Sequence, residues 1–70
     1  MNWVDTPDSS NIGRFRYLND ESTLEIEFRK GGIYQYFDVP EAVADQFALA
    51  ASKGQYFAQN IKGTYRYAKA

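Results

Sequence analysis

Residues 23–36, TLEIEFRKGGIYQY, hold the pattern that decides the fold. Their first half alternates apolar with charged residues, which is the period of a strand with one buried face. Gly31-Gly32 follows, and a glycine pair between two alternating runs predicts a hairpin, because glycine reaches positive φ without a Cβ clash. Tyr34, Tyr36 and Phe37 come next. The hairpin register decides whether these rings lie inside the fold or on a surface that binds a ligand.

The hairpin loop can hold two or three residues, and the two lengths place the tyrosines on opposite faces. A loop of Gly31-Gly32 alone puts Tyr34 and Tyr36 beside the charged residues of the preceding strand. A three-residue loop that begins at Lys30 pairs Phe28 with Tyr34 and puts both rings on the apolar face. Because register follows the choice that makes one face coherently apolar, we favour the longer loop and predict that both tyrosines are core residues.

Further strand patterns flank the hairpin. Residues 1–11 contain Pro7, two Ser, two Asn and two Asp, which compete with regular structure by local hydrogen bonding, so residues 1–8 are predicted to be an irregular lead-in. From Ile12 the chain alternates again and predicts a strand. After Gly63 the tail alternates once more, and it forms either a short edge strand or, over residues 66–70, a frayed end.

Two helices are predicted after the hairpin. Pro40 fits the first turn of a helix, where its missing N–H is no loss, and Asp38 can help satisfy the free N–H groups there. Lys53-Gly54 suits the end of that helix. A second short helix is predicted over residues 55–62, where two apolar residues stand four positions apart.

These elements predict one α+β domain over residues 1–70, with an antiparallel meander of about three strands covered on one face by a helix and a second short helix. Twelve aromatic residues, each burying ~150–250 Å² when packed, compensate for the short chain. On the opposite, charged face, Glu25 and Glu27 are expected to pair with Arg14, Arg16 or Arg29 rather than to form an acid–base pair.

The composition excludes several classes of active site. Cys and His are both absent, which removes disulfides, cysteine nucleophiles, the usual zinc ligands and the imidazole base. Ser9 and Ser10 lack an adjacent base, so we predict a protein that is not an enzyme, with no catalytic residue, metal or cofactor. Neither a secretory signal nor a long apolar run occurs, so we expect a cytoplasmic location and no membrane partner or small-molecule substrate.

The charges are unevenly distributed along the chain. Residues 1–45 hold nine acids and four bases, a net of −5, whereas residues 46–70 hold four bases and no acid, a net of +4. The basic segment also carries aromatic residues, and single-stranded nucleic acid needs cations for its phosphates and rings for its bases. A weak RNA-binding surface is therefore one hypothesis, although the same rings could pack on the sheet while the lysines are solvated. Its residues are Lys53, Tyr56, Lys62, Tyr65, Arg66, Tyr67 and Lys69.

A protein-interaction module is the alternative function. The longer hairpin loop leaves Phe37 exposed, and the outer sheet face or an open C-terminal strand edge would suit a protein partner. Trp3 lies outside the periodic region and either closes the end of the sheet or anchors a partner.

Several short motifs, in this order, resemble the KTSC domain family: Ser9-Ser10-Asn11-Ile12, Gly31-Gly32-Ile33-Tyr34-Gln35-Tyr36, Val39-Pro40, and Ser52-Lys53-Gly54-Gln55-Tyr56-Phe57. The family takes its name from a C-terminal extension of some lysyl-tRNA synthetases and also occurs as small bacterial proteins. The resemblance implies a domain of unestablished function, with RNA binding suggested by the synthetase association. It implies no catalytic residue.

Overall fold

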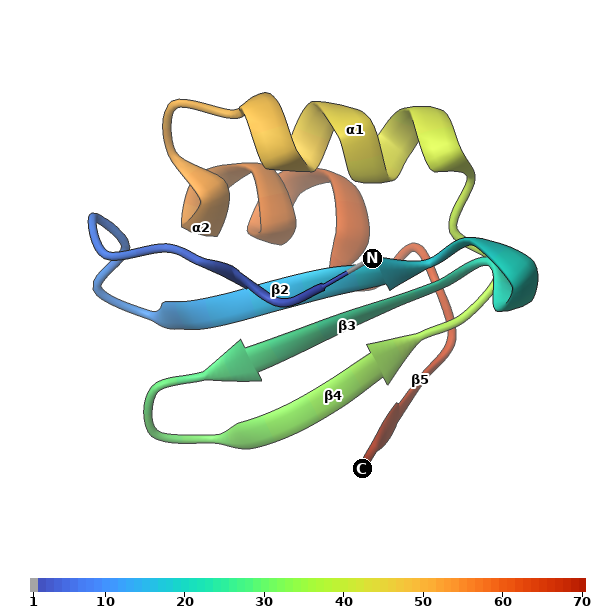
Figure 1. Ribbon diagram of the computed structural model, residues 1–70, viewed down its shortest axis with the longest axis horizontal. Helices are drawn as coiled ribbons and strands as arrows, with labels where there is room; N and C mark the ends of the chain where they lie inside the picture. The colour runs from blue at the N-terminus through green and yellow to red at the C-terminus, as the bar shows by residue number, and fades with distance from the viewer. Residues whose placement is uncertain (1) are drawn as a thin grey trace.

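The computed structural model describes residues 2–70 as a sheet with helices on one face (Figure 1). The sheet is antiparallel and has five strands in the order β1-β2-β3-β4-β5, rather than about three. The α+β class and the two helices agree with the prediction. The elements are β1 (Val4–Asp5), β2 (Ile12–Leu18), η1 (Asn19–Glu21), β3 (Thr23–Phe28), β4 (Gly32–Tyr36), α1 (Glu41–Leu49), α2 (Lys53–Tyr56), η2 (Phe57–Ile61) and β5 (Tyr67–Lys69).

The two additional strands are the edges of the sheet; β1 was not expected, whereas β5 is the short edge strand that was one of the two alternatives for the tail. β1 lies inside the segment expected to be irregular, and its register places Val4 opposite Phe15. The chain after β1 stays attached to the sheet because the Thr6 hydroxyl donates to the Ile12 carbonyl at 2.5 Å. At the other edge, the tail forms β5 on β4 instead of fraying, and the Ala70 amide donates to the Ile33 carbonyl at 2.8 Å.

The β3–β4 hairpin has a different register from the favoured one. Its loop is residues 29–31, so Phe28 lies opposite Gly32 and Ile26 opposite Tyr34, two residues away from the expected pairing. Because side chains alternate between faces with a period of two, this shift keeps the tyrosines on the face they were expected to occupy. Gly32 has a φ of 83°, the left-handed conformation that glycine adopts without strain.

The core lies between the sheet and the helices. A register shift between Ile12 and Arg14 brings Ile12 and Phe15 onto the same buried face, although they are three residues apart. The Phe15 ring meets Phe47 of α1 edge-to-face, with 4.8 Å between ring centroids. Phe57 and Ile61 are the buried residues of η2, at the spacing that predicted the second helix.

The helix boundaries differ from the prediction. α1 follows Pro40 and ends at Leu49, and Lys53 begins α2 rather than ending α1. The Lys53 ammonium still donates to the Ala50 carbonyl beyond α1, at 3.3 Å. Asp38 does not cap α1. It adopts a φ of 58° and its carboxylate binds Arg66 at 2.9 Å. Within residues 2–70, no helix has the length and apolarity needed to span a membrane.

Candidate nucleic-acid interface

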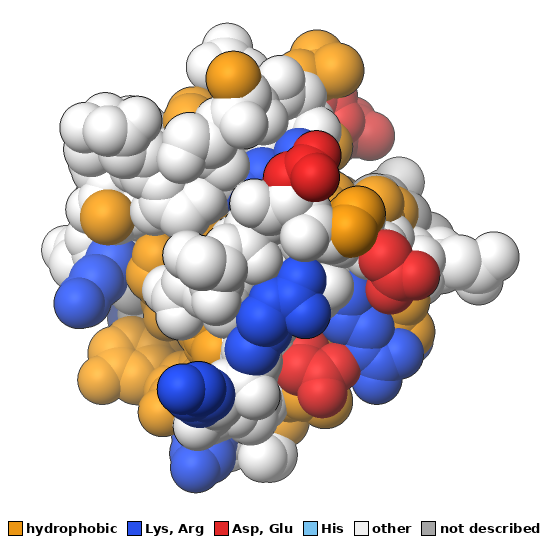
Figure 2. Space-filling view, turned by 90° about the vertical axis from the view of Figure 1, so that its left-hand side faces the viewer, with side chains coloured by type: hydrophobic (Ala, Val, Ile, Leu, Met, Phe, Trp, Pro, Cys, Tyr) orange, Lys and Arg blue, Asp and Glu red, His pale blue; other side chains and the backbone are white. Residues whose placement is uncertain are grey.

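A groove of about 480 Å³ opens between the β3–β4 hairpin, η2 and β5. We call it the aromatic groove, because five of its lining residues are Phe or Tyr. Figure 2 looks at the hairpin end of the molecule and shows apolar side chains at the lower left with Lys and Arg side chains close by. The lining residues are Asn11, Phe28, Lys30, Gly31, Tyr34, Tyr36, Phe57, Lys62, Gly63 and Tyr67.

The pairing of β5 with β4 assembles the tyrosine part of the groove. Tyr67 lies opposite Tyr36 in the register, and their ring centroids are 5.6 Å apart with an interplanar angle of 30°. The Tyr67 ring is also 5.9 Å from Tyr34. The two paired tyrosines differ in exposure: Tyr67 is 62% exposed and Tyr36 only 5%. Tyr67 is therefore the outer ring, and it lies over tyrosines that the sheet holds in place.

Two phenylalanines fix the inner wall of the groove. Phe28 meets Tyr34 edge-to-face at 5.7 Å and Phe57 at 5.2 Å. Phe57 in turn meets Tyr36 at 5.4 Å. These contacts join β3, β4 and η2, so the wall consists of core side chains that tertiary packing already orders. A ligand that stacks on this surface would not have to order the wall first.

The rim of the groove is basic. Lys30 comes from the hairpin loop and Lys62 from the residue after η2, and neither forms an ion pair with a residue in the described range 2–70. The side chain of Lys69 lies beside the hairpin. Its Cε atom is close enough to Gly32 that a Cβ atom added to this glycine would be 3.3 Å from it. These cations extend on flexible stems next to the rings, which is the combination that binds a phosphate and a base together.

The Tyr36 hydroxyl remains protonated near neutral pH. Burial raises the pKa of Tyr36 above its ordinary value of 10.0, and the neighbouring Tyr67 and Tyr34 raise it further. Tyr36 can therefore donate a hydrogen bond at neutral pH and carries no charge that would repel a phosphate.

The structure divides the residues predicted to bind nucleic acid among different places. Lys62 and Tyr67 line the aromatic groove. Tyr65 and Arg66 line a neighbouring open hollow that also touches Tyr67. Lys69 lies beside the groove, at the hairpin. Only part of the predicted surface is therefore continuous.

Three of the predicted residues are engaged within the fold. Lys53 donates to a backbone carbonyl and lines a separate cleft. Tyr56 is half-buried, with its ring 6.2 Å from Phe47 in the core. The Arg66 guanidinium binds Asp38 and lies 5.3 Å from the centroid of the Phe37 ring.

Sequence reasoning missed the hairpin's share of the groove. Lys30 was treated only as a loop residue, and Asn11 only as part of a motif. Tyr34 and Tyr36 were assigned to the core alone, whereas Tyr34 is half-buried and both line the groove. The available signal was the alternating tail: a strand there could pair with the hairpin and bring basic and aromatic residues from both segments together.

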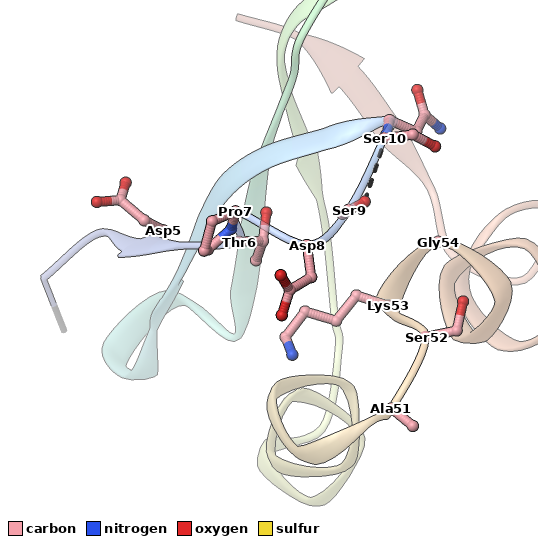
Figure 3. A pocket seen from close by; sticks show the side chains of 11 residues that line it. Asp5, Thr6, Pro7, Asp8, Ser9, Ser10, Ala51, Ser52, Lys53 and Gly54 are labelled. Carbon is pink, nitrogen blue, oxygen red and sulfur yellow. Dashed lines mark hydrogen bonds between the residues drawn. The ribbon is translucent and has the colours of Figure 1, made fainter.

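A second, polar cleft of about 520 Å³ lies between residues 5–11 and residues 51–54 (Figure 3). Asp8 and Lys53 extend into it from its two sides (Figure 3). The Ser9 hydroxyl accepts hydrogen bonds from the Asn11 amide at 3.4 Å and from the Ile12 amide at 3.0 Å. Ser9 therefore stabilises the turn that precedes β2. No group of three or more carboxylates within residues 2–70 is arranged to hold a metal ion.

The outer sheet face is occupied by the chain's own side chains. Arg14 pairs with Glu27, and Arg16 with Glu25, as the sequence predicted. The guanidinium carbons of Arg14 and Arg16 lie 4.3 and 4.6 Å from the centroid of the Trp3 ring. Trp3 thus packs on this face, against the two arginines. Phe37, expected to be exposed, is half-buried under Arg66.

Comparison with known proteins places this fold and sequence in one family. The model of the KTSC domain matches residues 8–65. A lysine–tRNA ligase of Trichormus variabilis is 44% identical over 61 residues, which cover 87% of this chain but 11% of the ligase. An uncharacterized protein of Stutzerimonas stutzeri is 37% identical over 84% of each chain.

A solved structure supports the same assignment. The crystal structure of a KTSC domain protein from Yersinia pestis has a TM-score of 0.94 and 39% sequence identity, and the match covers 99% of this chain and 96% of that chain. The chain spans about a tenth of the length of the matched tRNA ligases, and nearly all of the bacterial KTSC protein. The match to the family model and the shared fold show that this chain belongs to the KTSC domain family.

Proposed function

We propose that this chain is a small, non-catalytic RNA-binding module that uses the aromatic groove. One observation carries the proposal: three tyrosine rings and two lysines without ion pairs in residues 2–70 line the same groove. Aromatic rings stack on bases and ammonium groups bind phosphates, so this groove combines both elements of single-strand recognition. The similarity to lysine–tRNA ligases supports RNA as the ligand, because those relatives are named for a reaction on tRNA.

The charge of the molecule limits the affinity. The formal net charge is −1, so attraction to RNA is local to the groove rather than a property of the whole surface. If Lys30, Lys62 and Lys69 each neutralise one phosphate, the logarithm of the binding constant should fall with the logarithm of salt with a slope of about −2. Raising salt from about 50 to 200 mM should then weaken binding by about 15- to 20-fold.

An NMR titration of the ¹⁵N-labelled chain with tRNA and with a pool of short single-stranded RNA tests the proposal. Amide shifts should concentrate at Lys30, Lys62 and Tyr67 and fade with added salt. A Lys30→Gln/Lys62→Gln double variant should lose most of the response, whereas Lys53→Gln should keep it, because Lys53 lines the other cleft. A spectrum that neither RNA moves at low salt would overturn the proposal.

A protein partner remains the second candidate, and β5 is the observation that favours it. β5 is an edge strand of three exposed residues, and within residues 2–70 it pairs with β4 alone, so its other side is open to a further strand. The outer sheet face is less suited, because Trp3 and the ion pairs already cover part of it. Binding at this edge would depend little on salt.

A further inference from the structure

We propose that the aromatic groove takes an unpaired nucleotide of a single strand and excludes duplex RNA. This inference rests on the proposed RNA-binding function and names the class of RNA. The ligand would place one base against Tyr67 and the phosphates on either side of that nucleotide near Lys30 and Lys62.

The exposure of the rings supports an unpaired base. Tyr67 is 62% exposed, the highest exposed fraction among the aromatic residues of the groove, and its ring lies near those of Tyr34 and Tyr36. A base can stack on such a ring only if one of its own faces is free. Inside a duplex, neighbouring base pairs cover both faces of each base, and the grooves present base edges and 2′-hydroxyl groups. A ring set among hairpin and helix residues therefore cannot stack on a base pair inside a duplex.

The placement of the cations supports a strand rather than an isolated base. Lys30 and Lys62 come from two different elements, yet both line the groove that holds the rings. One nucleotide within a strand has a phosphate on each side, so two separate ammonium groups complement it in charge. Asn11 also lines the groove, and its side chain ends in a carboxamide. It offers both a donor and an acceptor to the edge of an unpaired base.

Fluorescence anisotropy at low salt tests the inference with the full chain and two RNAs. The first is a labelled 12-nucleotide single strand of mixed sequence that forms no hairpin, and the second is the same labelled strand in a blunt duplex. The single strand should bind at least tenfold more tightly. Tyr67→Ala should weaken single-strand binding about tenfold or more, the size of effect that the loss of a stacked base produces. Tyr67→Phe should stay within about twofold of the parent, because it keeps the ring.

Two further variants keep the test independent of folding. Leu49→Ala is the matched control, because Leu49 is an exposed apolar residue, at 85%, on α1 and outside the groove. It should bind like the parent. Lys30→Gln changes an exposed loop residue, should leave the NMR spectrum dispersed, and should weaken single-strand binding several-fold.

The outcomes separate this inference from the proposed function. If duplex and single strand bind with equal affinity, and Tyr67→Ala leaves that affinity unchanged, the inference is overturned. The chain would then be an RNA-binding module that contacts only phosphates. Preference for the single strand with Tyr67→Ala and Leu49→Ala equally affected would also overturn it, because the ring would then have no particular role. No binding of either RNA would overturn both proposals.

Discussion

Replacing Glu25 with glutamine should lower the free energy of unfolding by about 2 kcal/mol. Glu25 is 5% exposed, and its carboxylate accepts hydrogen bonds from Arg16 and, at 2.7 Å, from Gln35. Hydrogen bonds to charged groups contribute about 1.5–3 kcal/mol each and neutral ones about 0.5–1.5 kcal/mol. The glutamine amide keeps one acceptor oxygen and presents an NH2 donor in place of the other, so the Gln35 amide has to rotate to accept from it while Arg16 loses an anionic acceptor. Each of the two changes should cost about 1 kcal/mol. The side chain of Arg16 remains 35% exposed, so water takes up part of its lost partner.

Glu27→Gln is the matched control on the same strand and the same face. Glu27 pairs with Arg14 as Glu25 pairs with Arg16, but both side chains of this second pair are more than a third exposed, at 36% and 38%. Solvent screens such a pair, so its loss should cost only about 0.5 kcal/mol. With about 4–8 °C in Tm per kcal/mol for a domain of this size, Glu25→Gln should unfold about 8–16 °C lower and Glu27→Gln about 2–4 °C lower.

The pH dependence gives the same prediction a second test. Burial raises the pKa of the Glu25 carboxyl, but the hydrogen bonds from Gln35 and Arg16 and the charge of Arg16 outweigh it, so the pKa lies below the ordinary 4.5. A carboxyl with a lowered pKa stabilises the fold above its ordinary pKa, and that contribution is lost as the pH falls through the folded-state pKa. The stability gap between parent and Glu25→Gln should therefore be widest near pH 7 and narrow toward pH 3.

Urea unfolding followed by Trp3 fluorescence measures both effects, because the ring lies 4.6 Å from Arg16 and loses that contact on unfolding. The far-ultraviolet circular dichroism signal should give the same midpoint. Equal losses for Glu25→Gln and Glu27→Gln would refute the reasoning, because burial would then make no difference to the two pairs. A gap that stays constant from pH 7 to pH 3 would refute the assignment of the loss to the Glu25 charge.

Two further pairs of substitutions test the hairpin and the core. Gly32→Ala should lower the free energy of unfolding by roughly 1–2 kcal/mol, because the φ of 83° at Gly32 is left-handed. Gly31 does not have a positive φ, so Gly31→Ala should be neutral or stabilise by about 0.4–1 kcal/mol. Thermal unfolding that ranks the two variants in the opposite order would contradict the observed loop. Phe47→Ala should cost about 3–5 kcal/mol, because Phe47 is 0% exposed against Phe15, and Leu49→Ala on the same helix should stay within about 0.5 kcal/mol. A Phe47→Ala protein with an unchanged urea midpoint would show that this ring does not hold α1 on the sheet.

The fold was predictable where the local pattern is long, and not where it is short. β3 and β4 alternate over enough residues to fix both their existence and the face that is buried. β1 has two residues, in a segment with turn-forming composition, so no periodicity could reveal it. The residues of the hairpin loop could not be predicted either, because Gly31 and Gly32 both permit a turn. The expected and the observed register bury the same face, and only the cross-strand contacts distinguish them.

The types of residue that line the groove could be predicted from the sequence, but not which residues come together there. The basic and aromatic residues of the C-terminal segment are visible in the sequence, and Lys62 and Tyr67 do line the groove. Lys30 is more than thirty positions away from both, and nothing local links the hairpin loop to the tail. That link is the β4–β5 pairing, which is a long-range contact that sequence periodicity does not encode.

The hairpin tyrosines belong to the core and to the groove together, and this double position explains how so short a chain can present a shaped surface. Tyr36 is buried against Phe57, while Tyr34 is only half-buried between Phe28 and Tyr67. A chain of this length has too few residues to build a core and a separate binding wall. If the same rings serve both purposes, changes at Tyr36 should lower stability and binding together, whereas changes at Tyr67 should affect binding alone. Comparing the unfolding midpoint and the RNA affinity of the two alanine variants would separate these roles.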